Sequence, residues 1–352
     1  MTSKPWPQFN ETCGYLTKKG FLLEGYMGKY FSQWLYKEDV LSKKCPLEEE
    51  FYVYANAIQR TLFSAKAFVN SAFPNCNITV HHVDKDKPDP IFSPYIHNSS
   101  AIFKKIALDE MKNVLNKLKL DLSYKIMEDI LDYKNSDFCK LNNNCNMAAD
   151  ENKLDITVGK KPKLSGPLKI CNEAVDEFMM AYYDGFPMTE VAWGRLNDTE
   201  QWRPILDLTA SYHNVTFNTT HVANDLARPL IQYMADKFIN KTSKIILLMG
   251  HDANINVFLK AMSFKFYSLE DSFVSTPIGG KIVFQKWYNE NLNKYYLKIN
   301  YVYQSDEQLR EGHALSLKNP PKSTLLELKY CKVDENGFCP WDEFIEFLNS
   351  LI

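Results

Sequence analysis

The regular structure of the chain is expected to start with a helix, as the spacing of its apolar residues indicates. From Thr17 to Leu35, large apolar side chains recur every three or four residues, which is the period of one helix face. Similar patterns predict helices at residues 59–73, 167–184, 199–213, 221–239, 254–262 and 341–351, and a long amphipathic helical stretch at 101–133.

Strands are predicted where apolar residues form short runs or alternate with polar ones. Residues 244–249 read KIILLM, a continuous apolar run of the kind that parallel sheets bury on both faces. Further strands are predicted at 51–56, 78–82, 280–287 and 296–303, and loops at 1–13, 88–94, 142–144 and 151–166. Strands that alternate with helices indicate an α/β sandwich.

The composition is that of an ordinary globular protein, and it excludes several classes of function. The 352 residues are 45% hydrophobic and 24% charged, with a formal net charge of −2. Without a basic excess we expect no nucleic-acid partner, and without an apolar run of about 18 residues we expect no membrane span. The histidines show no metal-ligand spacing, so neither a metal nor another cofactor is expected. The length suits one large domain or two smaller ones.

Two strand ends carry side chains suited to phosphate chemistry, and the first of them is Arg60. In open α/β sheets, ligands bind beyond the carboxyl ends of the strands. Arg60 follows the strand at 51–56 and falls in the first turn of the next helix. A guanidinium and exposed backbone N–H groups there together attract phosphate. The alternative is a surface arginine, or one that pairs with a nearby carboxylate.

The second strand end carries His251 and Asp252. Gly250 lets the chain turn sharply after the strand at 244–249, so His251 is expected to donate a hydrogen bond to an anionic oxygen. Asp252 then lies where a leaving group is protonated, which is the role of a general acid. The alternative is structural: Asp252 is the N-cap of the following helix, and His251 fills a polar gap.

These segments and several others resemble the histidine acid phosphatases, branch 2 of the histidine phosphatase superfamily, and look most similar to the bacterial periplasmic glucose-1-phosphatases and phytases. The resemblance runs through YLTKKGFLLEGYMGKYFSQWL at 15–35, VYANAIQRT at 53–61, AFPNCNITVHH at 72–82, DGFPMTEVAWG at 184–194, LLMGHDANI at 247–255 and TPIGGKIVFQKW at 276–287. It implies a three-layer α/β/α sandwich with a mainly parallel sheet. We expect the core at 1–95 and 215–352, and a mainly helical cap at 96–214.

The resemblance also implies roles for three residues. Arg60 matches the arginine that clamps the phosphate, and His251 matches the histidine that hydrogen-bonds a phosphate oxygen. Asp252 matches the proton donor to the leaving alcohol. The implied function is metal-free hydrolysis of small phosphate esters, such as glucose 1-phosphate or phytate, through a phosphohistidine. An acid optimum is expected, because Asp252 must be protonated to act.

The nucleophile of the family is a histidine in an RHGxRxP-like motif at the end of the first core strand, and no such motif occurs among residues 1–352. We therefore expect the chain as written to be inactive. We also expect the first core strand to be absent, which leaves neighbouring strands with unpaired backbone groups. A truncated start is favoured over an evolved pseudoenzyme. The alternatives are an inactive relative that binds phosphorylated ligands, and an assembly or storage protein that reuses the fold.

Arg195 departs from the pattern of the family. Glucose-1-phosphatase-like sequences tend to carry an acidic residue at this position, after Trp193-Gly194. If Arg195 faces the substrate, its positive charge favours more anionic substrates, such as inositol polyphosphates. The alternative is a solvent-facing arginine.

Eight cysteines have spacings that invite pairing. Cys139 with Cys145, and Cys331 with Cys339, could each close a small local loop. The resemblance supports both pairs and also Cys45 with Cys76, while Cys13 and Cys171 either pair with each other or stay unpaired. Disulfides imply an oxidising compartment, so a periplasmic or secreted location is expected. The opening residues show no export signal, a conflict that again favours a missing start. The oligomeric state stays open.

Overall fold

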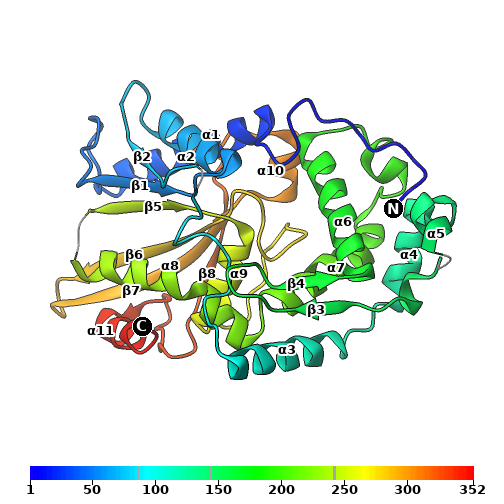
Figure 1. Ribbon diagram of the computed structural model, residues 1–352. Coiled ribbons are helices and arrows are strands. Elements are labelled where there is room, and N and C mark those ends of the chain that lie inside the picture. The colour runs from blue at the N-terminus through cyan, green and yellow to red at the C-terminus, as the bar shows by residue number, and fades with distance from the viewer. Residues whose placement is uncertain (86, 143–144, 241–242) are drawn as a thin grey trace. The chain divides into compact units, whose positions relative to one another are not determined.

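The computed structural model describes residues 1–85, 87–142, 145–240 and 243–352 (Figure 1). The chain forms two compact units. The helical unit contains Met1–Asn10 and Pro94–Leu226, and the sheet unit contains Glu11–Ser93 and Ala227–Ile352. The predicted loop at 142–144 falls mostly outside the described residues, because only Asn142 is described, at the end of helix α5 (Asp137–Asn142).

A three-stranded parallel sheet forms the first part of the sheet unit. Its order is β2 (Val80–His81), β1 (Phe51–Ala55) and β5 (Ile245–Met249), and both ladders are parallel. Ala55 lies opposite Met249 in the ladder, so β1 and β5 end side by side. The parallel α/β arrangement predicted from the sequence is confirmed for these strands.

The strands that follow residue 280 form a second, antiparallel sheet. It contains β6 (Lys281–Asn289), β7 (Lys294–Tyr303), β8 (Lys322–Leu326) and β9 (Cys339–Pro340), with β7 paired to the other three. The connection between β6 and β7 is a short turn, which permits only antiparallel pairing. The predicted parallel pairing therefore applies to β1, β2 and β5 alone. Strands β8 and β9 and helix α10 (Asp306–Glu311) were not predicted, since each has six residues or fewer.

Helices α1 (Lys18–Lys37) and α2 (Gln59–Ala72) cover one face of the sheet unit. Met27 of α1 and Phe68 of α2 share a buried apolar cluster with Phe51, Val53 and Ala55 of β1. Successive side chains of a strand point to opposite faces, so this cluster uses every second residue of β1. The side chain of Thr17 caps α1 by accepting from the N–H of Gly20, at the predicted helix start.

Helices α8 (Thr220–Asn240), α9 (Asp252–Ala261) and α11 (Trp341–Asn349) cover the opposite face (Figure 1). Tyr54 of β1 has its ring 5.7 Å from that of Tyr233 in α8. Phe284 of β6 contacts Phe238 of α8 at 5.6 Å and Phe258 of α9 at 6.0 Å. The predicted three-layer α/β/α arrangement is therefore confirmed.

The environment of β5 differs from the prediction. We expected this apolar strand to be buried on both faces, but all five residues of Ile245–Met249 are only half-buried. The reason is its position, because β5 pairs with β1 on one side and with no other strand among the described residues. An edge strand leaves half of its backbone groups, and part of its side-chain surface, uncovered.

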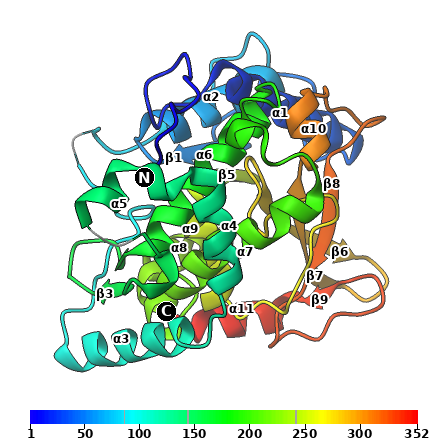
Figure 2. The ribbon, with the colours of Figure 1, turned by 90° about the vertical axis from the view of Figure 1, so that its right-hand side faces the viewer.

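The helical unit is built from α3 (Ala101–Leu115), α4 (Asp121–Leu131), α6 (Pro167–Asp184) and α7 (Thr199–Thr216), and α4 and α6 both pack against α7 (Figure 2). The stretch predicted at 101–133 is thus two helices. The loop predicted at 151–166 contains a hairpin of β3 (Lys153–Asp155) and β4 (Lys163–Ser165). This loop prediction was wrong, because three-residue strands give too short an alternation to recognise.

Residues 1–10 belong to the helical unit, although the sequence placed them in the core. The Trp6 ring lies 5.6 Å from Phe178 and 5.1 Å from Trp193, and Phe9 lies 4.8 Å from Phe186. The indole Nε1 of Trp193 donates to the backbone carbonyl of Pro5 at 2.8 Å. Contacts between aromatic rings explain this placement, and a segment without hydrophobic periodicity gave no signal for it.

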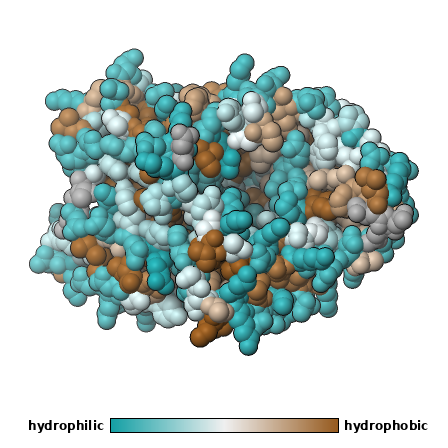
Figure 3. All heavy atoms as spheres, viewed as in Figure 1, coloured by the Kyte–Doolittle hydropathy of each residue, from teal (hydrophilic) through white to brown (hydrophobic). Residues whose placement is uncertain are grey.

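The structure contains disulfides between Cys45 and Cys76, Cys139 and Cys145, and Cys331 and Cys339. The cysteines without a disulfide are Cys13, which is exposed, and Cys171, which is buried. No helix in the described part of the chain is long and apolar enough to cross a membrane. On the face drawn in Figure 3, apolar residues lie in small groups between hydrophilic ones.

Candidate active site

The ends of β1 and β5 bring two helix starts together. Asn56 is buried, its N–H donates to the carbonyl of Met249 at 3.0 Å, and its Oδ1 accepts from the N–H of Ile58 at 2.9 Å. Thr61 Oγ1 donates back to the Asn56 carbonyl at 2.9 Å, which fixes the turn into α2. Arg60 is consequently held in the first turn of α2, beside the residues that follow β5.

Gly250 is required where β5 turns into α9. A Cβ atom at this position would lie 2.6 Å from the Phe92 ring and 2.9 Å from Oδ1 of Asn254. Phe92 is buried, so it has little room to move away. The sequence predicted that Gly250 permits a sharp turn, and the structure adds that Phe92 closes directly over it.

A buried hydrogen-bond network positions His251. Its backbone N–H donates to Asn254 Oδ1 at 2.9 Å, and Asn254 Nδ2 donates to the Phe92 carbonyl at 3.0 Å. The Asp89 carboxylate accepts the N–H of Phe92 at 2.9 Å and the hydroxyl of Tyr54 at 2.9 Å. Burial, followed by this hydrogen bond to Asp89, raises the pKa of Tyr54, which therefore remains a donor. The network connects β1 to the backbone of His251.

Arg60 and His251 meet at this edge of the sheet. Arg60 Nη2 lies 3.3 Å from His251 Nδ1, and Arg60 Nη1 donates to the Gly14 carbonyl at 3.4 Å. A guanidinium only donates, so Nδ1 must accept and the ring proton must reside on Nε2. In this tautomer His251 can donate from Nε2 to an anionic oxygen. Arg60 is exposed and His251 half-buried, so both are accessible to a ligand.

Asp252 is the first residue of α9, and its side chain is exposed. The N-cap of this helix is His251, so the alternative that Asp252 caps the helix is wrong. The backbone carbonyl of Asp252 accepts from Asn256 Nδ2 at 3.0 Å, which fixes the first turn. The first turn of α9 therefore carries the exposed Asp252 side chain directly after His251.

A family model for branch 2 of the histidine phosphatase superfamily matches residues 2–302. The chain belongs to this family. A glucose-1-phosphatase of Providencia rettgeri is 41% identical over 98% of this chain and 84% of its own length, and one of Salmonella typhimurium is 42% identical over 99% and 86%. A Hafnia alvei phytase in complex with myo-inositol hexakis sulphate superposes with a TM-score of 0.88 at 26% identity, over 100% of this chain and 90% of that one.

Of the four site residues predicted for this histidine phosphatase, the sheet unit contains Arg60, His251 and Asp252. Arg195 belongs to the helical unit, where its Nη1 donates to the Asp129 carbonyl at 2.7 Å. Lys4 lies near Arg195. The pKa of Lys4 is lowered, mainly by burial and then by the positive charge of Arg195. Arg195 is exposed, and the carboxylate of Asp132 lies near both Lys4 and Arg195, where their charges lower its pKa after its hydrogen bonds to Ser3 and Asn135.

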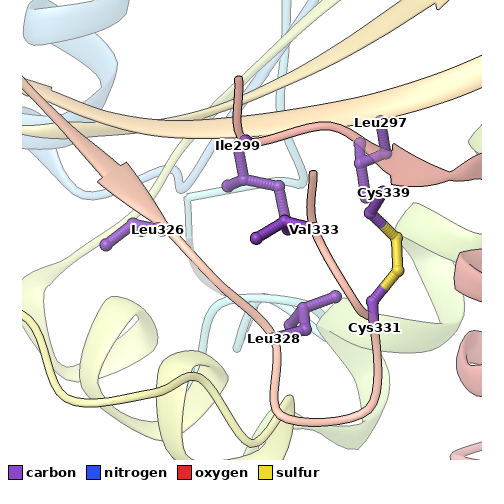
Figure 4. A pocket seen from close by; sticks show the side chains of 8 residues that line it. Leu297, Ile299, Leu326, Leu328, Cys331, Val333 and Cys339 are labelled. Atoms are coloured by element: carbon purple, nitrogen blue, oxygen red, sulfur yellow. A yellow bond between two sulfur atoms is a disulfide. The ribbon is translucent and has the colours of Figure 1, made fainter. Parts of the chain in front are cut away.

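No group of three or more His, Cys, Asp or Glu residues that could hold a metal occurs among the described residues. A small cavity in the antiparallel sheet is lined almost entirely by aliphatic side chains and bordered by the Cys331–Cys339 disulfide (Figure 4). Its lining contains no titratable side chain, so it is a packing defect rather than a site.

Sequence reasoning missed the residues that hold His251 in place. Asn254 carried a usable signal, since it stands three residues after the helix N-cap, the position from which a capping-box side chain returns to the N-cap N–H. Asp89 and Phe92 carried none, because they lie in a loop about 160 residues upstream of Asn254.

We expect Asn254→Ala to weaken the site without removing any proposed ligand contact. The variant leaves the His251 N–H and the Phe92 carbonyl unpaired, which costs about 1–3 kcal/mol for each buried group. Unfolding in urea measures this loss of stability. Asn254→Asp is the matched control, because it keeps the acceptor for His251 and loses only the donor. Equal stability of Asn254→Ala and the parent chain would contradict the positioning role.

Proposed function

We propose that this histidine phosphatase acts on phosphate monoesters, with Arg60 and His251 holding the phosphate and Asp252 donating a proton to the leaving alcohol. The observation that carries the proposal is the 3.3 Å contact between Arg60 Nη2 and His251 Nδ1 at the common end of β1 and β5. Glucose-1-phosphatase relatives at 41% and 42% identity support the same class of reaction.

The physical basis of the proposed phosphate binding is a positive electrostatic potential together with hydrogen-bond donors of fixed direction. Arg60 lies in the first turn of α2, and His251 directly precedes α9, so two helix N-termini and a guanidinium meet at one edge. Each of these favours an anion, and the backbone N–H groups and Nη atoms supply hydrogen bonds to phosphate oxygens. A carboxylic acid in the first turn of α9 then supplies the proton that a sugar alkoxide needs in order to leave.

For the substrate class we propose sugar phosphates, and more highly charged inositol phosphates as further substrates. The glucose-1-phosphatase relatives support the first group. The second is supported by the phytase structure that binds myo-inositol hexakis sulphate, and by the positive charge of Arg195 at a position where glucose-1-phosphatase-like sequences tend to carry an acidic residue. We propose Arg195 as a substrate-binding residue on this basis.

We propose further that residues 1–352 alone bind phosphate esters without forming a phosphohistidine. No histidine of this sequence is flanked by arginines in the manner of an RHGxRxP-like motif. Arg60, His251 and Asp252 supply binding and proton donation, but none of them supplies an in-line nucleophile. An inactive, ligand-binding member of the family is the second candidate, and it shares this binding site.

The three disulfides support a further proposal about location. Cys45–Cys76 and the two local pairs are stable only where thiols are oxidised. We propose a periplasmic or secreted location for the protein.

Phosphate binding tests the proposed site directly. We expect Arg60→Ala to lower the affinity for inorganic phosphate by about 10- to 100-fold, since hydrogen bonds between charged partners contribute roughly 1.5–3 kcal/mol. Calorimetric titration at low salt provides the measurement. Arg203→Ala is the control, because it removes an exposed arginine that pairs with Glu200 within helix α7. Equal phosphate affinity of Arg60→Ala and Arg203→Ala would overturn the proposed site.

Turnover separates an enzyme from an inactive binder. The 352-residue chain is incubated with p-nitrophenyl phosphate near pH 4–5, and released phosphate is measured. Binding of phosphate esters without release of phosphate supports the proposal that residues 1–352 alone form no phosphohistidine. Release together with a trapped phosphohistidine would show that another histidine of the chain is the nucleophile. A folded chain that binds no phosphate would favour a protein that merely reuses the fold.

A further inference from the structure

The chain contains seven tripeptides of the form Asn-x-Ser or Asn-x-Thr in which the middle residue is not proline. Six of them end in threonine, and these begin at Asn10, Asn77, Asn197, Asn214, Asn218 and Asn240. The seventh begins at Asn98 and ends at Ser100. With 29 asparagines and 15 threonines, a random order of the 352 residues would give only about one Asn-x-Thr tripeptide, so this spacing is enriched in the chain.

No common element of secondary structure explains the spacing. Asn77 and Thr79 lie in the loop before β2. Asn214 and Thr216 lie within α7, and Asn240 is the last residue of α8. The threonines differ as well, since Thr216 is buried and Thr79 is exposed. A helix cap or a turn would require the same local structure at each place, so neither of them accounts for the enrichment.

The asparagines of these tripeptides share a position at the surface. Six of the seven are exposed, and Asn218 is half-buried. The buried asparagines among the described residues all lie outside the tripeptides, and they are Asn56, Asn172, Asn254 and Asn256. N-linked oligosaccharides are bulky and hydrophilic, so a folded protein can carry them only on exposed asparagines. The exposed members of the set meet this requirement.

Four of the exposed asparagines also lie outside helices and strands, namely Asn10, Asn77, Asn98 and Asn197. At Asn98, Oδ1 accepts from the N–H of Ser100 at 2.9 Å, which leaves the amide nitrogen Nδ2 outside this hydrogen bond. At Asn197, Nδ2 donates one N–H to the Gly194 carbonyl at 3.0 Å and has a second N–H. Both amide nitrogens can therefore carry a substituent and keep these hydrogen bonds.

We infer that Asn10, Asn77, Asn98 and Asn197 are attachment sites for N-linked oligosaccharides. The co-reactant is an oligosaccharide on a polyisoprenyl diphosphate carrier. Nδ2 forms a bond to C1 of the first sugar and gives one proton to a base of the transferring enzyme, while the bond from C1 to the diphosphate breaks and the diphosphate leaves with the electron pair. Such transfer takes place outside the cytosol, as does formation of the three disulfides. The inference does not depend on the phosphate site, which contains none of these asparagines.

Mass spectrometry of the protein isolated from the cells that naturally produce it tests the four sites. Digestion of its peptides with a peptide-N-glycosidase in heavy-oxygen water converts each glycan-bearing asparagine into an aspartate that carries one heavy oxygen atom. We expect this label at all four asparagines. Asn336 is the control, because it is exposed, precedes Gly337 and lies outside the tripeptides, so it reports spontaneous deamidation. Label at none of the four, or no more label there than at Asn336, would overturn the inference.

Two substitutions at Thr79 distinguish an N-linked oligosaccharide from other attachments. Thr79→Ala removes the hydroxyl group two residues after Asn77, whereas Thr79→Ser keeps it. Thr79 is exposed, so both variants should fold like the parent chain. Produced in the same cells, Thr79→Ala is expected to lose the label at Asn77 and the mass of one oligosaccharide, while Thr79→Ser retains both. A label that persists in Thr79→Ala, or that disappears from both variants, would refute attachment at Asn77.

Discussion

Replacing Asp252 by asparagine is expected to slow the hydrolysis of glucose 1-phosphate by about 100- to 10,000-fold, the range that positioned general acids contribute. Asparagine keeps the shape of the side chain in the first turn of α9 but has no carboxyl proton to transfer. A sugar leaves as a poor alkoxide, so it depends strongly on that proton. p-Nitrophenolate is a good leaving group, and its release should be slowed much less.

The contrast between these two substrates is the measurement that identifies a proton donor. A residue that only binds phosphate would affect both substrates alike. Turnover is measured on the chain extended by a strand and an RHGxRxP-like segment, because the 352-residue chain alone is proposed to bind phosphate esters without forming a phosphohistidine. Asp342→Asn is the matched control, because Asp342 is an exposed carboxylate in the first turn of α11. Equal losses with glucose 1-phosphate and p-nitrophenyl phosphate would exclude Asp252 as the donor.

Replacing Lys281 by methionine is expected to lower the free energy of unfolding by about 3–5 kcal/mol. Lys281 Nζ lies 2.7 Å from Glu24 Oε1, and the two side chains are only 12% and 6% exposed. Methionine fills most of the same volume, but it leaves the Glu24 carboxylate buried without its counter-charge. The loss should appear as a lower midpoint of unfolding in urea.

A double substitution separates the lost charge from altered packing. Glu24→Gln combined with Lys281→Met removes both charges, so it should recover most of the stability that Lys281→Met alone loses. Lys265→Met is the control, because Lys265 pairs with Glu327 at 2.6 Å with exposed fractions of 50% and 32%. Its expected effect is at most about 1 kcal/mol. Equal effects of Lys281→Met and Lys265→Met would show that the buried pair contributes little.

The difference between these two ion pairs also shows a property that the sequence does not predict, which is the burial of a charged side chain. Lys281 and Lys265 are both lysines next to strands or turns, and nothing in their local sequence distinguishes them. Burial distinguishes them, and burial is decided by α1, which brings Glu24 to the start of β6. The same holds for β5, whose apolar sequence predicts full burial while its position at an open edge leaves it half-buried.

The sequence by itself determined the features that depend on neighbouring residues. Thr17 and the apolar spacing after it specify the first helix, and Gly250 after an apolar run specifies the turn that presents His251 and Asp252. Family resemblance adds the prediction that these strand ends carry the phosphate chemistry. The structural inferences succeed because helix caps, strand runs and tight turns are local, and because the carboxyl ends of parallel strands meet at one edge.

Only the tertiary structure decided which distant groups complete the site. The register of β1 and β5 brings Arg60 to 3.3 Å from His251, and Asn254 reaches the Phe92 carbonyl from a helix far along the chain. The position of β5 at the edge of its three described strands likewise appears only when the strands are placed in a sheet. Such pairings follow from packing many segments at once, so their energies depend on contacts that no local pattern encodes.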